Sequence, residues 1–553
     1  MAGKGEDEVL SAEAWLSRVR EVVPVALDRA GKVKGFVTRW RKIISRLEQI
    51  PSCLSDLSSH PCFSKNVLCK EQLQAVAGTV SEVIALAGLC LEEKCEGKLK
   101  MQNDLDTLSG KLDLNLRDCR LLIKTGVLGE ATVVLAPSPE QAACSGNLIE
   151  LLARLQIGHL EAKEKALDQL FEIMEEDEKT FLASLGRSNV SALIQLLTAT
   201  SSRIREKAVT IICNIAESGG GSEKWLISED ALPPLVRILE SGSGSVSKEK
   251  ALLTLQRLST SGETARAIVG HGGMRPLTDL CRTGDSVSQA AAACTLRNIS
   301  GIPENRQTVA EADIVKVMVD LLNCGILPKT REYAAEFLQH LTTGQDNIKK
   351  SVIREGGVQA LLGYIDGPLP KEPAAAAIRN VIESIPTEKL VSLNFLPRLA
   401  RVLKSGSPGA QQAAASAICK LCCSPEMIKL VGETECIIPL LINLLEVKSN
   451  ATREVSSQAL SSLMTIPQNC KEVKRIDKSV PNLVQLLDSN PNNTAKKYAV
   501  SCLLRLSYSS ACRRTMVSYG AVGYLRKLTE MGIPGSAQLV ERLEKGKLWN
   551  LFA

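Results

Sequence analysis

Aromatic residues are scarce in this chain. Phe, Trp and Tyr together make up 3% of its 553 residues, although hydrophobic residues of all kinds make up 44%. An interior of Leu, Ala, Val and Ile is typical of closely packed helices, because strands are enriched in aromatic and β-branched residues. The chain is also too long for one globular core unless that core is repeated. The composition therefore predicts a helical protein made of several units.

The sequence also lacks a strong charge and a targeting signal. Its net charge of +6 is slight for this length, and no dense Lys/Arg run is interleaved with aromatic residues, so we expect no nucleic-acid partner. Met1–Val9 is polar and acidic, so we expect no secretion and reduced thiols at the eighteen cysteines. The best apolar run, Val80–Leu91, is interrupted by Glu82 and predicts no integral membrane segment. We expect a cytoplasmic location, with the nucleus and the periphery of the plasma membrane as alternatives.

Motifs for catalysis are missing too. The sequence has no Gly-x-x-x-x-Gly-Lys-Ser/Thr, no Gly-x-Ser-x-Gly and no His-Glu-x-x-His. Cys419 and Cys422 have the spacing of half a zinc site, but no second pair of ligands lies nearby. Cysteine is also common as a small buried residue in helices. We therefore predict no enzyme activity, no metal, no cofactor and no small-molecule substrate.

A Leu-rich helical pattern repeats through most of the chain. Its successive starting positions are 42, 42, 41, 43, 38, 42, 42 and 42 residues apart. Such regular spacing is the sequence signature of a repeat architecture. The starting residues are Leu193, Leu235, Leu277, Met318, Leu361, Leu399, Leu441, Leu483 and Leu525.

A second, Ala-rich pattern recurs in step with the first. Apolar residues follow each alanine at four and seven places, which puts them on one helical face. The small alanines let neighbouring helices approach closely. These reference alanines are Ala166, Ala208, Ala251, Ala292, Ala334, Ala374, Ala414, Ala459 and Ala499. Each unit of about 42 residues thus holds a short helix, a Leu-rich helix and a longer Ala-rich helix, a plan typical of HEAT and armadillo repeats.

The wording of individual units resembles the armadillo family. Examples are ALPPLVRILESG from Ala231 and AAACTLRNIS from Ala291. The resemblance implies an all-α fold, a right-handed superhelical solenoid. We expect about nine repeats over residues 143–530 and a capping helix with a tail over 531–553. The single 38-residue step, with Ile385-Pro386 nearby, predicts a distorted unit around residues 380–395.

The first 125 residues follow no 42-residue period. Helical periodicity over Ala12–Val33, Phe36–Leu57, Lys70–Leu91 and Leu99–Thr125 predicts a helical bundle, and residues 126–142 are expected to be a linker. This layout resembles plant armadillo proteins, including U-box ubiquitin ligases. Because no Cys-Pro-Ile-type U-box core is found and the linker is short, the chain more closely resembles the plant armadillo-repeat-only type.

The resemblance also suggests where partners bind. In armadillo proteins the third helix of each unit lines a concave groove, where an Asn can bond the backbone of an extended ligand. The matching place lies six residues after each reference alanine. The predicted protein-binding residues there are Asn214, Arg257, Asn298, His340, Asn380, Lys420 and Arg505. Importin-α-like proteins add a Trp one turn earlier, and this chain has none there, so an importin role is not expected.

Cations at three of these places favour partners with acidic segments, contacted by Arg257, Lys420 and Arg505. The competing interpretation is that they are solvated residues of an ordinary helix face. The resemblance implies a scaffold in intracellular signalling or polarised growth. Two alternatives remain: an accessory that recruits substrates to a separate ubiquitin ligase, and a membrane-peripheral adaptor that acts through the N-terminal bundle.

Overall fold

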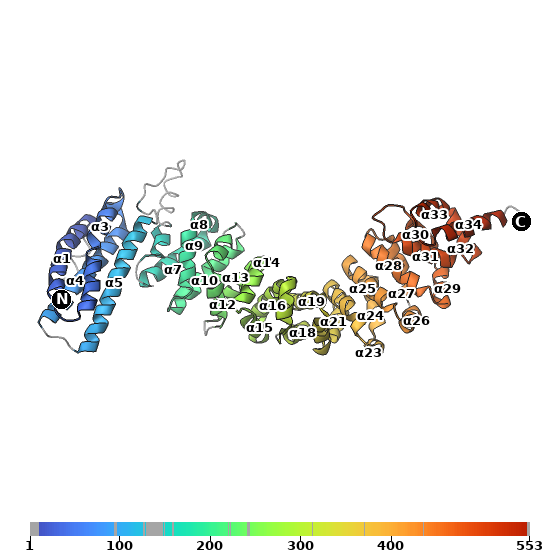
Figure 1. The fold of residues 1–553 in the computed structure, drawn as a ribbon, viewed down its shortest axis with the longest axis horizontal. Helices are drawn as coiled ribbons and strands as arrows, with labels where there is room; N and C mark the ends of the chain where they lie inside the picture. The colour runs from blue at the N-terminus through green and yellow to red at the C-terminus, as the bar shows by residue number, and fades with distance from the viewer. Residues whose placement is uncertain are drawn as a thin grey trace. The chain divides into compact units, whose positions relative to one another are not determined.

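A computed structural model describes residues 10–92, 97–124, 128, 148, 150–157, 160–218, 221, 223–240, 244–311, 313–369, 371–434 and 436–549 (Figure 1). The chain divides into two compact units, Met1–Thr254 and Leu255–Ala553. The division falls inside helix α13 (Ser245–Leu258). Apart from Leu128, the predicted linker over residues 126–142 lies outside the described residues.

Unit 1 begins with a bundle of helices. Its elements are α1 (Ala12–Lys32), α2 (Val37–Leu47), α3 (Ile50–Ser58), the short 3-10 turn η1 (Phe63–Lys65), α4 (Val67–Leu91) and α5 (Lys98–Lys124). Helix α1 packs along α4, while α5 packs against α2, α3 and α4. The predicted second helix is divided in two, because Pro51 has no N–H to donate and fits in the first turn of a new helix.

Side chains at the helix ends and on the helix surfaces hold this bundle together. The Ser11 hydroxyl accepts a hydrogen bond from the Ala14 N–H, and Asn66 caps α4 in the same way through Cys69. Two ion pairs, Arg39–Asp106 and Arg46–Asp113, link α2 to α5. Both partners advance by seven residues between the pairs, so α2 and α5 run parallel.

Helix α4 corrects one expectation from the sequence. By length and composition it is apolar enough to cross a membrane, because Glu82 is the single charged residue between Gln72 and Leu91. The structure packs α4 between α1 and α5 with ten of its residues buried. The apolar character of α4 is therefore explained by its place in the core of the bundle.

Helix triplets follow the bundle. In unit 1 they comprise α7 (Leu160–Glu176), α8 (Glu178–Ser184), α9 (Arg187–Leu196), α10 (Ser202–Glu217), α11 (Glu223–Ser228), α12 (Leu232–Glu240) and the start of α13.

In unit 2 each triplet has a first, a second and a third helix. The first helices are α14 (Gly262–Gly270), α17 (Arg306–Glu311), α20 (Asp346–Arg354), α23 (Thr387–Ser392), α26 (Pro425–Glu433), α29 (Pro467–Arg475) and α32 (Ser510–Ser518). The second helices are α15 (Met274–Thr283), α18 (Ile314–Cys324), α21 (Gly357–Asp366), α24 (Phe395–Ser405), α27 (Ile437–Asn443), α30 (Ser479–Gln485) and α33 (Ala521–Glu530).

The third helices are α16 (Ser286–Gly301), α19 (Pro328–Thr342), α22 (Glu372–Val381), α25 (Pro408–Leu421), α28 (Asn450–Leu463), α31 (Lys496–Leu506) and α34 (Ser536–Trp549). Short 3-10 turns are η2 (Pro303–Asn305), η3 (Ile382–Ser384) and η4 (Leu444–Glu446). In the region expected to be distorted, α22 continues into η3 and α23 starts after Pro386.

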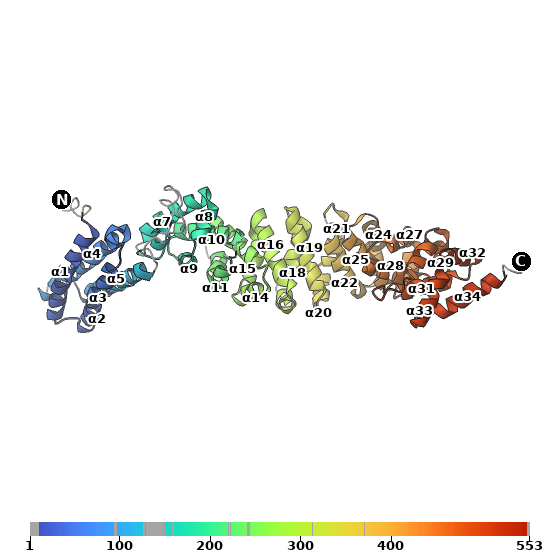
Figure 2. The ribbon, with the colours of Figure 1, turned by 90° about the horizontal axis from the view of Figure 1, so that it is seen from above.

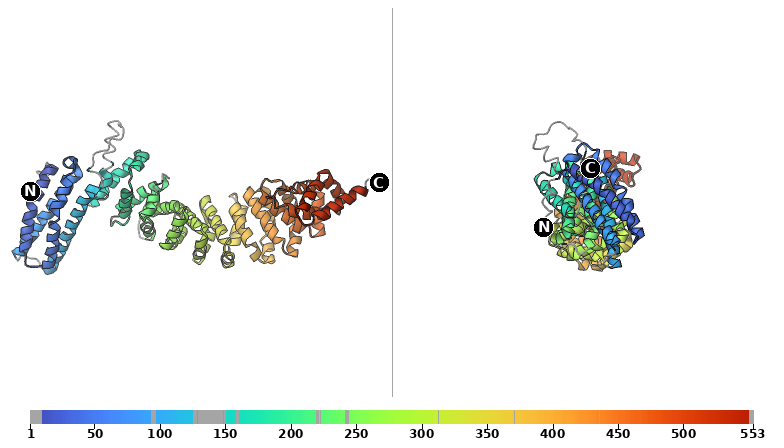
Figure 3. Two further views of the ribbon diagram at one scale, coloured as in Figure 1. Left: turned by 45° about the horizontal axis from the view of Figure 1, so that its top comes forward. Right: turned by 90° about the vertical axis from the view of Figure 1, so that its left-hand side faces the viewer.

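The third helices of unit 2 form a layer of their own. Each packs on the next, from α16 to α19, α22, α25, α28, α31 and α34. In Figure 1 the third helices α16, α19, α25 and α28 lie above the second helices α15, α18, α24 and α27, and Figure 2 shows them side by side from above. Figure 3 gives two further views of the ribbon, in which α22 to α34 lie in the yellow-to-red part.

Burial along the third helices from α16 to α31 follows one rule. Counted from the reference residue, places 0, 1, 3, 4, 7 and 8 are buried, as in Ala334, Ala335, Phe337, Leu338, Leu341 and Thr342. In α28 this rule fits Ser456 as the reference and not Ala459, which occupies place 3. The sequence prediction chose Ala459 because serine had replaced alanine at the true position. Serine is also small, so it satisfies the same close packing of helices.

Candidate functional site

The predicted binding residues all lie on one face of the third helices. We define the third-helix face as the residues two places before and two, five, six and nine places after each reference residue. Asn214 contributes to this face on α10 in unit 1, and Arg257 lies exposed on α13. Like Arg257, the remaining predicted residues belong to unit 2, and they are Asn298, His340, Asn380, Lys420 and Arg505.

Several of these residues bond to the preceding third helix. Asn298 Nδ2 donates to Ser259 Oγ at 2.8 Å, and Asn380 Nδ2 donates to Thr342 Oγ1 at 3.2 Å. His340 Nδ1 lies 3.0 Å from Ser300 Oγ. Each partner occupies place 8 of the helix before. These hydrogen bonds link each third helix to the one before it and so hold neighbouring repeats together. We call these place-6 side chains and their partners the ladder.

Lys420, Arg505 and Asn214 reach back in the same direction. Lys420 Nζ pairs with Glu383 Oε2 at 2.8 Å, and Arg505 Nη1 lies 3.4 Å from the Met464 carbonyl oxygen. In unit 1, Asn214 Nδ2 lies 3.6 Å from the sulfur of Met174. Place 6 thus contributes to packing between repeats, and its role in binding partners stays a prediction.

Two features of this face were missed from the sequence. The first is Arg542 on α34, which donates to Ser507 Oγ at 3.2 Å and to the Leu504 carbonyl at 3.3 Å. It therefore continues the ladder into the helix that the sequence predicted only as a cap. Because Ser507 is place 8 of α31, Arg542 corresponds to place 6 of α34. Serine takes the place of the reference alanine at position 536, and this hid the register.

The second missed feature is a half-buried ion pair in the middle of unit 2. Arg297 Nε lies 2.9 Å from Glu336 Oε2, and the Arg297 guanidinium stacks over the Tyr333 ring at 5.1 Å. The two side chains are 31% and 29% exposed. Burial raises the pKa of Glu336, although the Arg297 charge opposes this shift. The two charged residues belong to neighbouring repeats, and their charges neutralise each other.

His340 is the titratable residue of the ladder. Burial lowers its pKa, the hydrogen bond to the Arg297 carbonyl opposes that effect, and the charges of Arg306 and Arg297 lower it further. The neutral imidazole is therefore favoured in the folded chain at neutral pH.

The Cys-x-x-Cys spacing lies at the end of α25, where Cys419 is in the last turn and Cys422 is the C-cap residue. Burial raises the pKa of Cys419 to about 11 and that of Cys422 to about 12, so both remain protonated thiols at neutral pH. Over the described part of the chain, no cluster of three His, Cys, Asp or Glu residues is placed to hold a metal ion.

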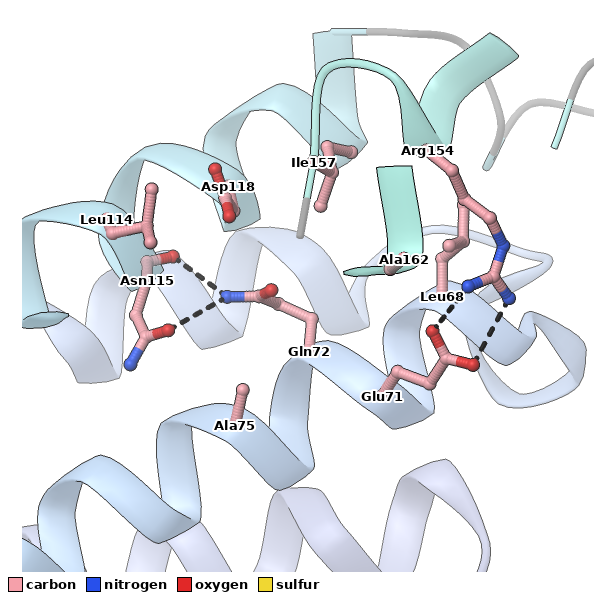
Figure 4. Close-up of a pocket in the computed structure, with 10 residues that line it drawn as sticks. All are labelled: Leu68, Glu71, Gln72, Ala75, Leu114, Asn115, Asp118, Arg154, Ile157 and Ala162. Carbon is pink, nitrogen blue, oxygen red and sulfur yellow. Dashed lines mark hydrogen bonds and ion pairs between the residues drawn. The ribbon is translucent and has the colours of Figure 1, made fainter. Parts of the chain in front are cut away.

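Unit 1 contains a cavity of about 90 Å³ where α4 and α5 meet Arg154, Ile157 and Ala162 (Figure 4). Arg154 pairs with Glu71 at 2.8 Å, and Gln72 Nε2 donates to the Asn115 carbonyl at 3.2 Å. A cavity of this size holds a few water molecules, whereas pockets for drug-sized ligands are several times larger. We interpret it as a hydrated joint that fixes the bundle against the first repeat.

Comparison with known families agrees with this architecture. Residues 17–127 match a domain of unknown function, DUF7032. Residues 263–301, which span α14 to α16 and so one whole triplet, match the armadillo/beta-catenin-like repeat. These matches fit an armadillo-repeat protein with an N-terminal helical domain. The predicted all-α armadillo fold is confirmed.

Known relatives of this armadillo-repeat protein include plant proteins. U-box domain-containing protein 44 of Arabidopsis thaliana is 27% identical over 49% of this chain and 34% of its own length. U-box domain-containing protein 43 of the same plant is 24% identical over 49% of this chain and 35% of its own. Vacuolar protein 8 of Schizosaccharomyces pombe is 25% identical over 29% of each chain. The chain thus spans about a third of the length of these relatives.

A solved structure supports the solenoid fold. The crystal structure of an engineered protein superposes with a TM-score of 0.60 and 25% identity, over 72% of this chain and 99% of that one.

Proposed function

We propose that this armadillo-repeat protein is a non-catalytic scaffold that binds segments of partner proteins along its third-helix face. The observation that carries the proposal is the unbroken stacking of third helices in unit 2, each of which presents side chains at the same places. Armadillo solenoids generally bind proteins, and stacked repeats offer an extended surface that needs no pocket. The similarity to U-box domain-containing proteins also supports a protein-interaction role.

The proposal extends to the kind of partner and its setting. The cations at place 6 favour acidic partner segments, and intracellular signalling or polarised growth is the proposed setting, in the cytoplasm or at the plasma-membrane periphery. Arg257 is a proposed contact, and Asn298 and Asn380 are proposed contacts in addition to their ladder roles. An Asn side chain has both a hydrogen-bond donor and an acceptor. The donor can bond the previous repeat while the acceptor bonds the backbone of a ligand.

Affinity capture from cells tests the scaffold. The chain is compared with the pair Arg257→Glu/Lys420→Glu and with the control pair Lys471→Glu/Lys474→Glu, which makes the same charge change on the first helix α29. We expect partners to be lost only from the first pair, with circular dichroism unchanged. Equal partner sets from all three chains would contradict a binding role for the third-helix face. Lys420→Glu also faces Glu383, so the thermal midpoint is measured alongside.

A second candidate is an accessory of a separate ubiquitin ligase, which the U-box relatives favour. Enrichment of ubiquitin-conjugating enzymes with the captured chain would support it. If other partners are captured in detectable amounts but no ubiquitin-conjugating enzyme is enriched, this candidate is contradicted.

A third candidate is attachment to membranes through the bundle. Leu89, Leu91 and Leu99 are 44%, 43% and 73% exposed at the end of α4 and the start of α5. Flotation of the full chain with anionic liposomes tests this, and a chain that stays at the bottom of the gradient removes the candidate.

A further inference from the structure

Positive charge in this chain is concentrated at the C-terminal end. Residues 466–553 contain fourteen Lys or Arg and six Asp or Glu, a net charge of +8, whereas the whole chain carries +6. The first 465 residues are therefore slightly acidic. A local excess of this size attracts an acidic partner more strongly than the overall charge suggests.

Part of that excess lies on one face of α31 and its immediate C-terminal extension. Lys497, Ser501 and Arg505 are four residues apart, and Tyr508 follows three residues later, so all four share a side of the helix. Tyr508 is 73% exposed. The Arg542 guanidinium from α34 stacks over the Tyr508 ring at 4.4 Å and donates to its hydroxyl at 3.1 Å. Stacking holds the Tyr508 ring and the Arg542 charge in a fixed relation.

The surface between α28 and α31 carries two small side chains, Ser461 and Ser501, and we call it the serine floor. Ser461, place 5 of α28, donates to Ser501, place 2 of α31, at 2.9 Å. Between α16 and α19 the same two places hold Arg297 and Glu336, which fill the surface and neutralise each other. Two serines in their place leave room for a ligand backbone and offer it hydroxyl groups.

The cations beside this floor bind no carboxylate within the described part of the chain. Arg505 and Arg542 donate to backbone carbonyls, and Lys497 lies over the Tyr498 ring at 4.7 Å. Two acidic residues are nearby: Glu454, which accepts a hydrogen bond from Thr494 at 2.6 Å, and Glu541 on α34. The charge at this end is therefore available to an external anion.

We propose that Lys497, Arg505 and Arg542, with Ser461, Ser501 and Tyr508, form a docking site for an extended acidic segment of a partner protein. Carboxylates of that segment contact Lys497, Arg505 and Arg542. Its backbone lies on the serine floor, and an apolar side chain packs on Tyr508. This inference rests on the proposed scaffold function and specifies where on the third-helix face the acidic segment binds.

Fluorescence anisotropy with labelled peptides tests the docking site in the full chain. The probes are 12-residue peptides with one Leu and with zero, three or six Glu residues, the remainder being Gln and Ser. We expect affinity to rise with the number of Glu residues and to fall at least tenfold in Lys497→Glu/Arg505→Glu. The milder pair Lys497→Gln/Arg505→Gln guards against misfolding and should fall at least threefold. The control pair Lys471→Glu/Lys474→Glu should stay within twofold.

The outcomes separate this inference from the scaffold proposal. An equal loss in the control pair would overturn it, because the attraction would then be a property of overall charge. If Arg257→Glu/Lys420→Glu abolishes capture of cellular partners while the α31 variants leave both capture and peptide binding unchanged, the docking site is wrong and the scaffold stands. If no variant of the third-helix face changes either measurement, both are wrong. Salt-sensitive dimers that the α31 variants abolish, without peptide binding, would assign the site to a second copy.

Discussion

The middle and the end of the third-helix face in unit 2 use the same places differently. Between α16 and α19 those places hold Arg297 and Glu336, which are partly buried and form an ion pair between two neighbouring repeats. Between α28 and α31 they hold two serines, and the cations at the margin contact carbonyls, hydroxyls and aromatic rings but no carboxylate in the described chain. Charges that neutralise each other stabilise the stack, whereas uncompensated charges remain available to a partner. On this comparison the Arg297–Glu336 pair stabilises the stack, and the end between α28 and α34 is the proposed docking site for acidic segments.

Among the variants that test this comparison, Arg297→Ala should have the largest effect on the free energy of unfolding. Glu336 would keep its partly buried carboxylate without a cation, so we expect a loss of about 1–2 kcal/mol in the free energy of unfolding. Urea denaturation measures it, and adding Glu336→Gln should recover part of the loss. Arg505→Ala is the matched control, expected to stay within about 0.5 kcal/mol. Equal losses at both arginines would contradict the division into a stabilising middle and a binding end.

Asn380→Ala should have the next largest effect. It removes the hydrogen bond to Thr342 and should cost about 1 kcal/mol of unfolding free energy. Thr342→Val removes the same bond from the other side, so the double variant should cost less than the sum of the single ones. Fully additive losses would show that this ladder bond contributes nothing.

His340 should give the stability of unit 2 a dependence on pH. Its pKa is lowered in the folded chain, so below the ordinary histidine pKa of about 6.5 the unfolded chain takes up a proton that the folded chain resists. The free energy of unfolding should therefore fall as pH decreases through this range, and His340→Gln should flatten that dependence. Denaturation at pH 7.5 and 5.5 measures both, and identical pH slopes in the two chains would contradict the assignment.

The smallest expected effect is that of Lys420→Gln. The pair with Glu383 is partly solvated, at 34% and 59% exposure, and should contribute no more than about 0.5 kcal/mol. Denaturation in low and high salt measures it, and the difference between the two chains should shrink as salt rises. A larger loss that persists in high salt would place Lys420 among the stabilising residues of the middle.

The repeat was predictable because its period depends on apolar and small residues, which the packing of each helix against its neighbours requires. The register of α28 was not, since Ser456 satisfies that packing as well as alanine does. The sequence also did not show that the place-6 side chains point toward the preceding repeat. A spacing of six shows that they share a face, but not that Asn298 reaches Ser259 in the preceding unit. The pairing of Arg297 with Glu336 joins residues 39 apart, which a period alone cannot show.

Hydrogen–deuterium exchange of the full chain, alone and with a captured partner protein, tests the central claim most directly. The account predicts slower backbone exchange on binding in α28, α31 and α34, with little change in the first helices α29 and α32. Protection confined to the N-terminal bundle or to the first helices would contradict the claim that partners bind the third-helix face.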